Sequence, residues 1–310
     1  MGTKPLKNLE EIVVVGGGMA GLAAARHAAR LGRLVTLFEG SGLYGGQIAT
    51  IGHVEGLLLP GDHSGQDLAM HLHEQAKKMG VRIVEAEVAT LDAGPRLTLI
   101  DSEGGHYSPE AVIVASGAHL RSLGIPGEAG FAGRGVSRCA TCDGGFYKDK
   151  HVVVIGGGDA AVHEALTLAG MVGHVTMVCR SPVKAKREQV NRLDARENVR
   201  FIWDSEVVEI IGDSKVTGVR LRSTRSGLER EILCDGVFPF IGVEPNAGFV
   251  PAKLRDESGH VPTGADLATP DPRIFAVGAV RAGFGGNLAE AMAEGVSAAE
   301  AAARRFAGRY

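Results

Sequence analysis

Two cysteines separated by two residues are the most reactive feature of the sequence. Cys139 and Cys142 enclose Ala-Thr, and Asp143 follows directly. This spacing brings two thiols close enough to form a disulfide that can open and close, beside a carboxyl group that can carry protons. With only four cysteines in the chain, the motif predicts redox chemistry rather than a structural disulfide framework.

Two other interpretations of the cysteine pair stay open. A zinc half-site needs two further ligands, and no second Cys-x-x-Cys or paired histidine stands at ligand spacing. The pair could also be buried and unreactive, as free cysteines often are. We expect Cys179 and Cys234 to be buried and unreactive, because each stands alone in an apolar stretch.

A glycine-rich turn that could hold a coenzyme occurs twice. Four β-branched residues precede three glycines at Ile12-Val-Val-Val-Gly-Gly-Gly and again at Val152-Val-Val-Ile-Gly-Gly-Gly. Each copy continues into an alanine-rich stretch and then a second apolar run, Leu34 to Phe38 and Val175 to Val178. This pattern predicts a buried strand, a turn, a helix and a parallel strand, as in dinucleotide-binding domains.

The first turn carries the residues expected for an adenosine dinucleotide. Gly16, Gly18 and Gly21 let the backbone approach a pyrophosphate at a helix N-terminus. Glu39 stands at the end of the next strand, where an acid can bind the hydroxyls of a ribose. We expect an adenine dinucleotide at this turn.

The second turn differs at the position that corresponds to Glu39. Its start is formed by Gly156, Gly158, Asp159 and Ala160, but Cys179 replaces the acid. Basic residues follow, among them Arg180 and Lys184. Basic side chains there favour a ribose 2′-phosphate, hence NADPH over NADH, although a solvated basic face at a helix start is the alternative.

Composition and length limit the classes of function. The chain has 310 residues, which accommodates two nucleotide-binding domains, and 33 basic against 36 acidic residues give a net charge of −3. No long run of one charge suggests a nucleic-acid or membrane surface. The N-terminus lacks the pattern of a signal peptide, and glycines interrupt the first apolar run. We therefore expect a cytoplasmic protein without nucleic-acid or membrane partners.

The order of the apolar segments predicts how the domains are connected. The strand-like segments Ala111 to Ala115 and Ile274 to Gly278 are both expected in the first sheet, with a closing helix from Leu288 to Phe306. The fold class is therefore α/β, with two doubly wound dinucleotide-binding domains, the second inserted in the first. The expected boundaries are 1–117 and 247–310 for the first domain and 118–246 for the second domain, in which the basic residues favour NAD(P).

Three side chains receive structural interpretations. We expect His71 and His73 on a solvated helix face, because no metal-ligand partner stands at suitable spacing. Trp203, the single tryptophan, is expected in the core.

Taken together, these motifs resemble the low-molecular-weight thioredoxin reductases over nearly the whole chain. The segments that carry the resemblance are Gly45-Gly46-Gln47, Ser116 to Glu128, Gly133 to Ser137, Cys139 to Asp143 and Phe240 to Asn246. The resemblance implies a homodimeric flavoprotein with FAD on the first domain, NADPH on the second, NADH as a second possible coenzyme, and a thioredoxin-like protein or a small disulfide as substrate.

The resemblance also implies roles for individual residues. Cys142 would be the thiol beside the flavin, Cys139 the thiol that attacks the partner disulfide, and Asp143 the acid/base that moves the thiol proton. Gly46, Gln47, Gly278, Ala279 and Asn287 would contribute to the FAD site.

The sequence departs from the family pattern around both coenzymes. Five family motifs are altered: Gly-Asp is Gly278-Ala279, Arg-Gln is Gly286-Asn287, Glu-Asn is Glu55-Gly56, His-Arg-Arg is Cys179-Arg180-Ser181, and Phe-Arg-Ala is Lys184-Ala185-Lys186. These changes leave two alternatives to an NADPH-dependent reductase. One is a flavoenzyme with another electron partner, such as a dithiol oxidase or a reductase fed by a different donor. The other is a catalytically silent, nucleotide-binding redox sensor.

Overall fold

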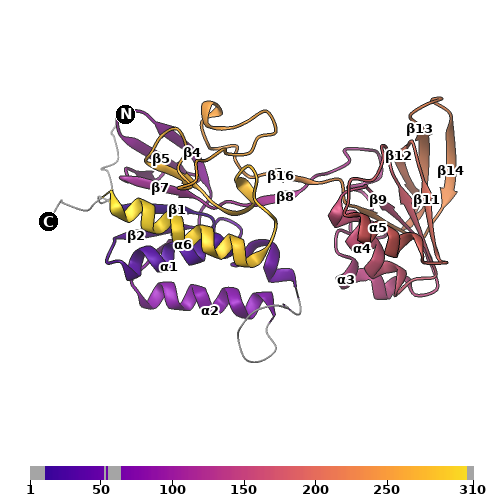
Figure 1. The fold of residues 1–310 in the computed structure, drawn as a ribbon, viewed down its shortest axis with the longest axis horizontal. Helices are drawn as coiled ribbons and strands as arrows, with labels where there is room; N and C mark the ends of the chain where they lie inside the picture. The colour runs from indigo at the N-terminus through magenta and orange to yellow at the C-terminus, as the bar shows by residue number, and fades with distance from the viewer. Residues whose placement is uncertain (1–10, 52–53, 55–63, 306–310) are drawn as a thin grey trace. The chain divides into compact units, whose positions relative to one another are not determined.

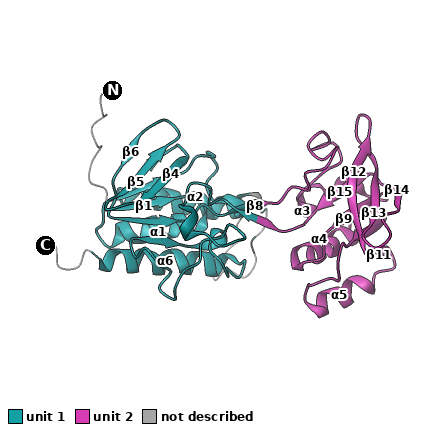
Figure 2. Cartoon of the chain, turned by 90° about the horizontal axis from the view of Figure 1, so that it is seen from above, with its two compact units in different colours: residues 1–119, 244–310 teal, residues 120–243 magenta. Residues whose placement is uncertain are grey.

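The chain folds into two compact units, one inserted in the other (Figure 2). The computed structural model describes residues 11–51, 54 and 64–305. Unit 1 consists of Met1–His119 and Glu244–Tyr310, and unit 2 consists of Leu120–Val243. The inserted order matches the expectation from the apolar segments.

The chain passes between the units after residues 119 and 243, a few residues from the expected boundaries at 117 and 246. Gln47 Nε2 donates a hydrogen bond to the Ala118 carbonyl at 2.6 Å, and Asn246 N donates to the Gly117 carbonyl at 3.0 Å. His119 Nδ1 lies 2.6 Å from Asn246 Oδ1. These bonds keep residues 118–119 and 244–246 with unit 1, whereas the glycines used to place the boundaries only mark where the chain turns.

Unit 1 is built on a parallel sheet with the strand order β17-β7-β1-β2-β3 (Figure 1). The strands are β1 (Ile12–Val15), β2 (Val35–Phe38), β3 (Arg82–Val84), β7 (Ala111–Val114) and β17 (Ile274–Ala276). Strand β1 pairs with β2 and β7, so that Ile12 lies opposite Val35 on one side and Ala111 on the other. The β-branched run therefore forms the central strand, and all four of its residues are buried.

Two different layers cover the faces of this sheet. On one face lie α1 (Met19–Arg30), α2 (Gly65–Lys78) and α6 (Leu288–Arg304), and on the other lie the antiparallel strands β4 (Val88–Ala93), β5 (Leu97–Asp101) and β6 (His106–Tyr107). Alternate residues of β1 supply the two cores: Ile12 and Val14 pack on the helices, and Val13 and Val15 pack on the antiparallel strands. The antiparallel layer is a feature that the sequence analysis did not anticipate.

Unit 2 repeats the same plan. Its parallel sheet has the order β11-β10-β9-β15. The strands are β9 (His151–Ile155), β10 (His174–Val178), β11 (Val199–Ile202) and β15 (Gly236–Pro239). The helices α3 (Ala140–Asp143), α4 (Asp159–Ala169) and α5 (Arg187–Asp194) lie on one side, and β12 (Ser205–Gly212), β13 (Val216–Ser223) and β14 (Glu229–Leu233) lie on the other.

The remaining elements are short. They are the strands β8 (Ala118–Leu120) and β16 (Val243–Pro245), which pair with each other in the two segments that connect the units, and the 3-10 turns η1 (Gly46–Thr50), η2 (Gly144–Tyr147), η3 (Ala252–Leu254) and η4 (Gly278–Val280).

Two side-chain expectations are wrong. Trp203 is 48% exposed, because it follows the edge strand β11 and stacks on Phe201 instead of entering the core. His73 is buried, because it stacks on Tyr44 with ring centroids 4.0 Å apart, and this burial lowers its pKa. His71 is exposed on the same helix, as expected.

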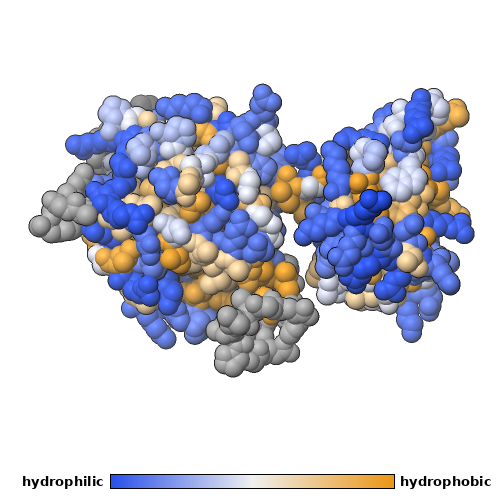
Figure 3. Space-filling model, viewed as in Figure 1, coloured by the Kyte–Doolittle hydropathy of each residue, from blue (hydrophilic) through white to orange (hydrophobic). Residues whose placement is uncertain are grey.

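Hydrophilic residues cover most of the face of each unit that Figure 3 shows. Of the helices formed by residues 11–51, 54 and 64–305, none has the length and apolar character needed to cross a bilayer.

Candidate functional site

The cysteine pair forms a disulfide at the start of a short helix in unit 2. The Cα atoms of Cys139 and Cys142 lie 5.3 Å apart. Cys139 caps α3, and its sulfur accepts a hydrogen bond from the Cys142 N–H at 3.1 Å. Cys142 is exposed and Cys139 is half-buried. A bonded pair with one exposed residue suits exchange with another disulfide, and the bond argues against a zinc half-site.

The carboxyl group that follows the pair has a phenol near it. Asp143 ends α3, and Tyr147 lies one turn further along in η2. Burial, and then the charge of Asp143, raise the pKa of Tyr147. Between them, Gly144 lies against the end of α4, where an added Cβ would meet Leu168 Cδ2 at 3.2 Å, and against Met171 just after the helix, whose Sδ it would meet at 2.8 Å. The redox motif therefore packs against α4. Asp143 is the group nearest to the cysteine pair in sequence that can carry a proton.

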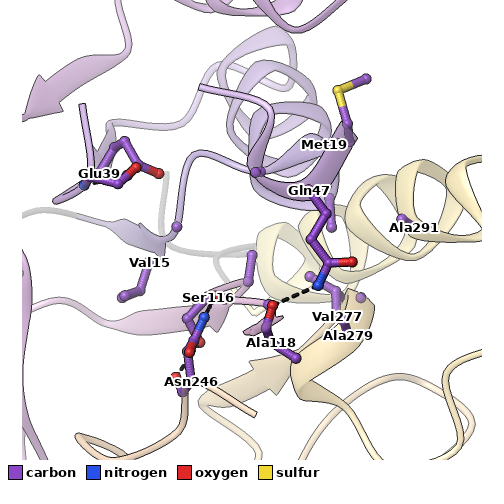
Figure 4. Close-up of a pocket in the computed structure, with 18 of the residues that line it drawn as sticks. Val15, Met19, Glu39, Gln47, Ser116, Ala118, Asn246, Val277, Ala279 and Ala291 are labelled. Atoms are coloured by element: carbon purple, nitrogen blue, oxygen red, sulfur yellow. Dashed lines mark hydrogen bonds between the residues drawn. The ribbon is translucent and has the colours of Figure 1, made fainter. Parts of the chain in front are cut away.

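The candidate site of unit 1 is a cavity of about 600 Å³ at the carboxyl ends of β1, β2 and β7 (Figure 4). That volume falls in the range of about 300 to 1,000 Å³ typical of ligand sites. Most of the FAD-site residues expected from the sequence line it: Gly16, Gly18, Glu39, Gly46, Gln47, Gly278, Ala279 and Asn287. The exception is Gly21, which lies behind the wall.

The first glycine turn has the shape that a close backbone approach requires. Gly16 has φ +109°, and an added Cβ would lie 2.4 Å from the Ala115 carbonyl oxygen. At Gly21 an added Cβ would lie 1.9 Å from the Gly16 carbonyl oxygen, so only glycine lets α1 pack against the turn. Gly18 meets nothing within 4 Å and leaves its side of the turn open.

Glu39 is fixed beside this turn. One carboxylate oxygen accepts a hydrogen bond from Gly17 N at 2.7 Å, and the other accepts from Ser41 N at 2.7 Å and Ser41 Oγ at 2.6 Å. The side chain is held in place by these bonds, and it reaches the cavity wall, as Figure 4 shows. An acceptor in this position suits the hydroxyl groups of a ribose.

The opposite end of the cavity is built from small residues and backbone. Ala279 follows Gly278, whose N–H is already bonded to Glu294 Oε2 at 2.7 Å. Asn287 caps α6, and its Oδ1 accepts from Glu290 N at 2.8 Å. Ala279 stands at the position where the family pattern has an aspartate. Glu55-Gly56, another departure from that pattern, lies outside the described residues.

The described residues that line this cavity include Glu39 and Glu87 but no lysine, arginine or histidine. The N-termini of two long helices, α1 and α6, reach the cavity, because their first residues, Met19 and Leu288, both line the wall. Helix N-termini bind phosphate groups without a basic side chain. The open turn, the ribose acceptor and these two helix ends fit a dinucleotide such as FAD.

Unit 2 has its own cavity, of about 790 Å³, around the second glycine turn. All expected coenzyme residues of this unit line it: Gly156, Gly158, Asp159, Ala160, Arg180 and Lys184. Gly156 has φ +135°, and an added Cβ would lie 2.2 Å from the Phe240 carbonyl oxygen. The geometry of the first turn is thus repeated.

The charge of the second cavity is different. Four of its lining residues are basic, namely Arg121, Arg180, Lys184 and Arg222. Arg222 is paired with Glu206 at 2.6 Å, and the carboxylate of Asp159 accepts a hydrogen bond from Lys186 N at 2.8 Å. Among the described residues, Arg121, Arg180 and Lys184 have no acidic partner. Their positive charges suit a phosphorylated ribose.

Sequence reasoning missed some residues of these sites. Asn246 lines the first cavity, where its Nδ2 donates to the Ser116 carbonyl at 2.9 Å (Figure 4). Arg121 and Arg222 line the second cavity from segments far from the glycine turn. Asn246 stands at the end of a motif used for the resemblance, which is the available sequence signal, whereas the two arginines carry none.

The two remaining cysteines are buried, as expected. Cys179 and Cys234 are 1% and 4% exposed, and both are free thiols. Burial raises the pKa of Cys179 to about 11 and that of Cys234 to about 12.

Comparison with known proteins agrees with this geometry. Residues 10–304 match the family described as pyridine nucleotide-disulphide oxidoreductase. The thioredoxin reductase of Treponema pallidum (strain Nichols) is 39% identical over 297 residues, which covers 94% of this chain and 96% of that protein.

Solved structures give the same result. A thioredoxin reductase of Lactococcus lactis in the FR conformation matches with a TM-score of 0.83 and 34% identity, covering 95% of this chain and 98% of that one. The thioredoxin reductase of T. acidophilum matches with a TM-score of 0.80 and 31% identity, covering 96% and 99%. The chain therefore belongs to the pyridine nucleotide-disulphide oxidoreductase family.

Proposed function

We propose that this protein is a flavin-dependent disulfide reductase that passes electrons from NADPH through FAD and the Cys139–Cys142 disulfide to a thioredoxin-like protein. The observation that carries the proposal is the Cys139–Cys142 disulfide, in which Cys142 is exposed, in a chain that also has a cavity at each of its two glycine turns. A silent sensor would not need both cavities and an accessible disulfide.

The cavity residues would bind the coenzymes in distinct ways. In unit 1, Glu39 would accept hydrogen bonds from a ribose, and the N-termini of α1 and α6 would face the pyrophosphate. In unit 2, Arg180 and Lys184 would neutralise a 2′-phosphate. A flavin in the first cavity would supply two-electron transfer between a pyridine nucleotide and a disulfide.

The cysteines then transfer the two electrons by thiol–disulfide exchange. With the pair reduced, the Cys139 thiolate attacks a sulfur of the substrate disulfide and forms a mixed disulfide, releasing one substrate thiolate. The Cys142 thiolate attacks the Cys139 sulfur, releases the second substrate thiolate and restores the Cys139–Cys142 bond. Asp143 would carry the protons that the two thiols lose and the substrate thiolates gain.

The order of the two cysteines in this scheme comes from the family resemblance. In the oxidised structure Cys142 is the more exposed residue of the pair, so exposure alone does not select Cys139 as the attacking group. Single serine variants separate the roles: Cys142→Ser should accumulate a mixed disulfide between Cys139 and thioredoxin, and Cys139→Ser should not. A mixed disulfide only with Cys139→Ser would reverse the assignment.

The proposal as a whole is tested by steady-state reduction of a thioredoxin from the same cell. We expect one NADPH to be oxidised for each disulfide reduced, with NADH used less efficiently. Absence of turnover with either coenzyme would reject the proposal.

The partners and the setting form part of the same proposal. We infer a homodimer from the family resemblance, to be checked by light scattering of the purified protein. We also infer a cytoplasmic setting, supported by the two thiols that remain free.

A further inference from the structure

The backbone N–H groups at the start of α3 are shared between a sulfur and a carboxylate. Cys142 N donates to Cys139 Sγ at 3.1 Å, and Asp143 N donates to the Cys139 carbonyl at 3.1 Å. Ala140 N donates instead to Glu164 Oε2 at 3.0 Å. The helix start that would stabilise a thiolate at Cys139 therefore also holds a carboxylate from α4.

Glu164 is partly buried in the middle of α4, next to the redox motif. Among the residues that the structure describes, it forms no ion pair. Ala140 N is four bonds from Cys139 Sγ, so the Glu164 carboxylate lies within about 8 Å of that sulfur. At this distance, in a partly buried setting, two negative charges disfavour each other appreciably.

A reductase needs a cysteine pair that gives electrons up readily. Thiol–disulfide proteins whose reduced thiolate is strongly stabilised are oxidants, because the stabilisation favours the dithiol over the disulfide. The helix start and the N–H bond to Cys139 Sγ both stabilise the thiolate. A nearby carboxylate opposes them and shifts the balance toward the disulfide.

We propose that Glu164 is a positioning residue that seats the start of α3 through Ala140 N and, by its charge, keeps the Cys139–Cys142 pair strongly reducing. The proposal rests on the proposed disulfide reductase function, because it concerns the same cysteine pair. It assigns the redox poise of that pair to a side chain outside the Cys-Ala-Thr-Cys-Asp motif.

The test is the redox equilibrium of the full chain against dithiothreitol. In this reaction the Cys139–Cys142 bond breaks, both sulfurs gain an electron and a proton, and dithiothreitol becomes its cyclic disulfide. The fraction reduced is read by alkylation and mass spectrometry. Glu164→Gln keeps the size and the acceptor but removes the charge. It should raise the equilibrium constant for reduction roughly three- to ten-fold at pH 7.5.

Glu197→Gln provides the matched control, because Glu197 is an exposed glutamate in the same unit without a described hydrogen bond. We expect it to stay within about two-fold of the wild type, and we expect the same of Glu164→Asp, which retains the charge. The other titratable groups on the elements packed against α3 are Asp159 and His163 on α4 and Tyr147 on η2. These groups, and Asp143 on α3 itself, are kept in all variants.

A charge effect also has a pH signature that a merely structural role lacks. The difference between Glu164→Gln and the wild type should shrink toward none at pH 5, where both thiols are protonated, and reappear as the pH rises. Equal constants for Glu164→Gln and Glu197→Gln at pH 7.5, or a difference independent of pH, would overturn the proposal. The measurement uses neither NADPH nor thioredoxin, so its outcome is separate from that of the proposed function.

Discussion

The two glycine turns of this protein have nearly the same backbone and different chemistry. Gly16 and Gly156 both have positive φ, and an added Cβ would strike a carbonyl oxygen at 2.4 Å in the first and 2.2 Å in the second. Gly18 and Gly158 both face open space. The same turn geometry, which lets a pyrophosphate come close to the backbone, therefore occurs once in each unit.

The difference lies in what stands after the following strand. In unit 1, Glu39 bonds to Gly17 N, and the cavity has no basic lining residue among those described. In unit 2, the Cys179 thiol lies 3.3 Å from the Gly156 carbonyl, and four basic residues line the cavity. The comparison teaches that coenzyme identity is determined by the side chains around the turn, while the turn itself provides only a place for phosphates.

The third position of each turn gives the largest expected effect. Gly21→Ala would place a Cβ 1.9 Å from the Gly16 carbonyl oxygen, so α1 must shift and we expect flavin content to fall at least roughly ten-fold. The second turn already carries Ala161. Ala161→Gly should lower the stability only by about 1 kcal/mol. Absorbance of the purified variants and thermal unfolding measure both, and equal flavin loss in the two would break the comparison.

Glu39 sharpens the comparison at the ribose. Glu39→Gln removes a charged acceptor that binds Gly17 N and Ser41, so we expect FAD affinity to fall roughly ten- to hundred-fold. The KM for NADPH should not change, because that coenzyme is assigned to unit 2. Flavin release by dialysis and fluorescence titration gives the affinity. A changed KM with unchanged flavin binding would exchange the two assignments.

Arg180 makes the corresponding test in unit 2. Arg180→Ala removes one of the basic residues of that cavity, and we expect the KM for NADPH to rise about ten-fold with little change for NADH. Steady-state kinetics with both coenzymes measures this. An equal loss with NADPH and NADH would show that the side chain contacts something other than the 2′-phosphate.

The smallest expected effect concerns Cys179, whose thiol stands at the position in unit 2 that corresponds to Glu39 in unit 1. Burial raises the pKa of Cys179 to about 11 and that of Cys234 to about 12, so at pH 8 only about one Cys179 in a thousand is a thiolate. In the native reduced protein, iodoacetamide should label Cys139 and Cys142 within minutes and leave the other two unmodified. Mass spectrometry after digestion reads this, and rapid labelling of Cys179 would indicate an open second turn.

The sequence predicts those parts of the molecule that depend on local patterns. The β-branched runs at Ile12 and Val152 form central buried strands, because an apolar run before a glycine turn is specific for a parallel sheet. The glycine turns and Glu39, which these local patterns predict, line the cavities as expected. Gly46, Gln47, Gly278, Ala279 and Asn287 also line the first cavity, but they are expected from the family resemblance. Gly21 instead serves the packing of α1 behind the turn.

Features set by contacts between distant segments are not predictable in this way. His73 is buried only because Tyr44 lies over it, and Trp203 is exposed because β11 is an edge strand. Glu164 carries no motif, and its role depends on α4 lying beside α3. Such residues are found only when the packing of the elements is known.

The most direct test of the account is an anaerobic titration of the purified protein with NADPH, followed through the visible absorbance of the flavin. If the first cavity holds FAD, the second holds NADPH and the cysteine pair accepts the electrons, the flavin bands should bleach with close to stoichiometric amounts of NADPH. Flavin bands that stay unchanged with NADPH and bleach only with a dithiol would contradict the assignment of the second cavity.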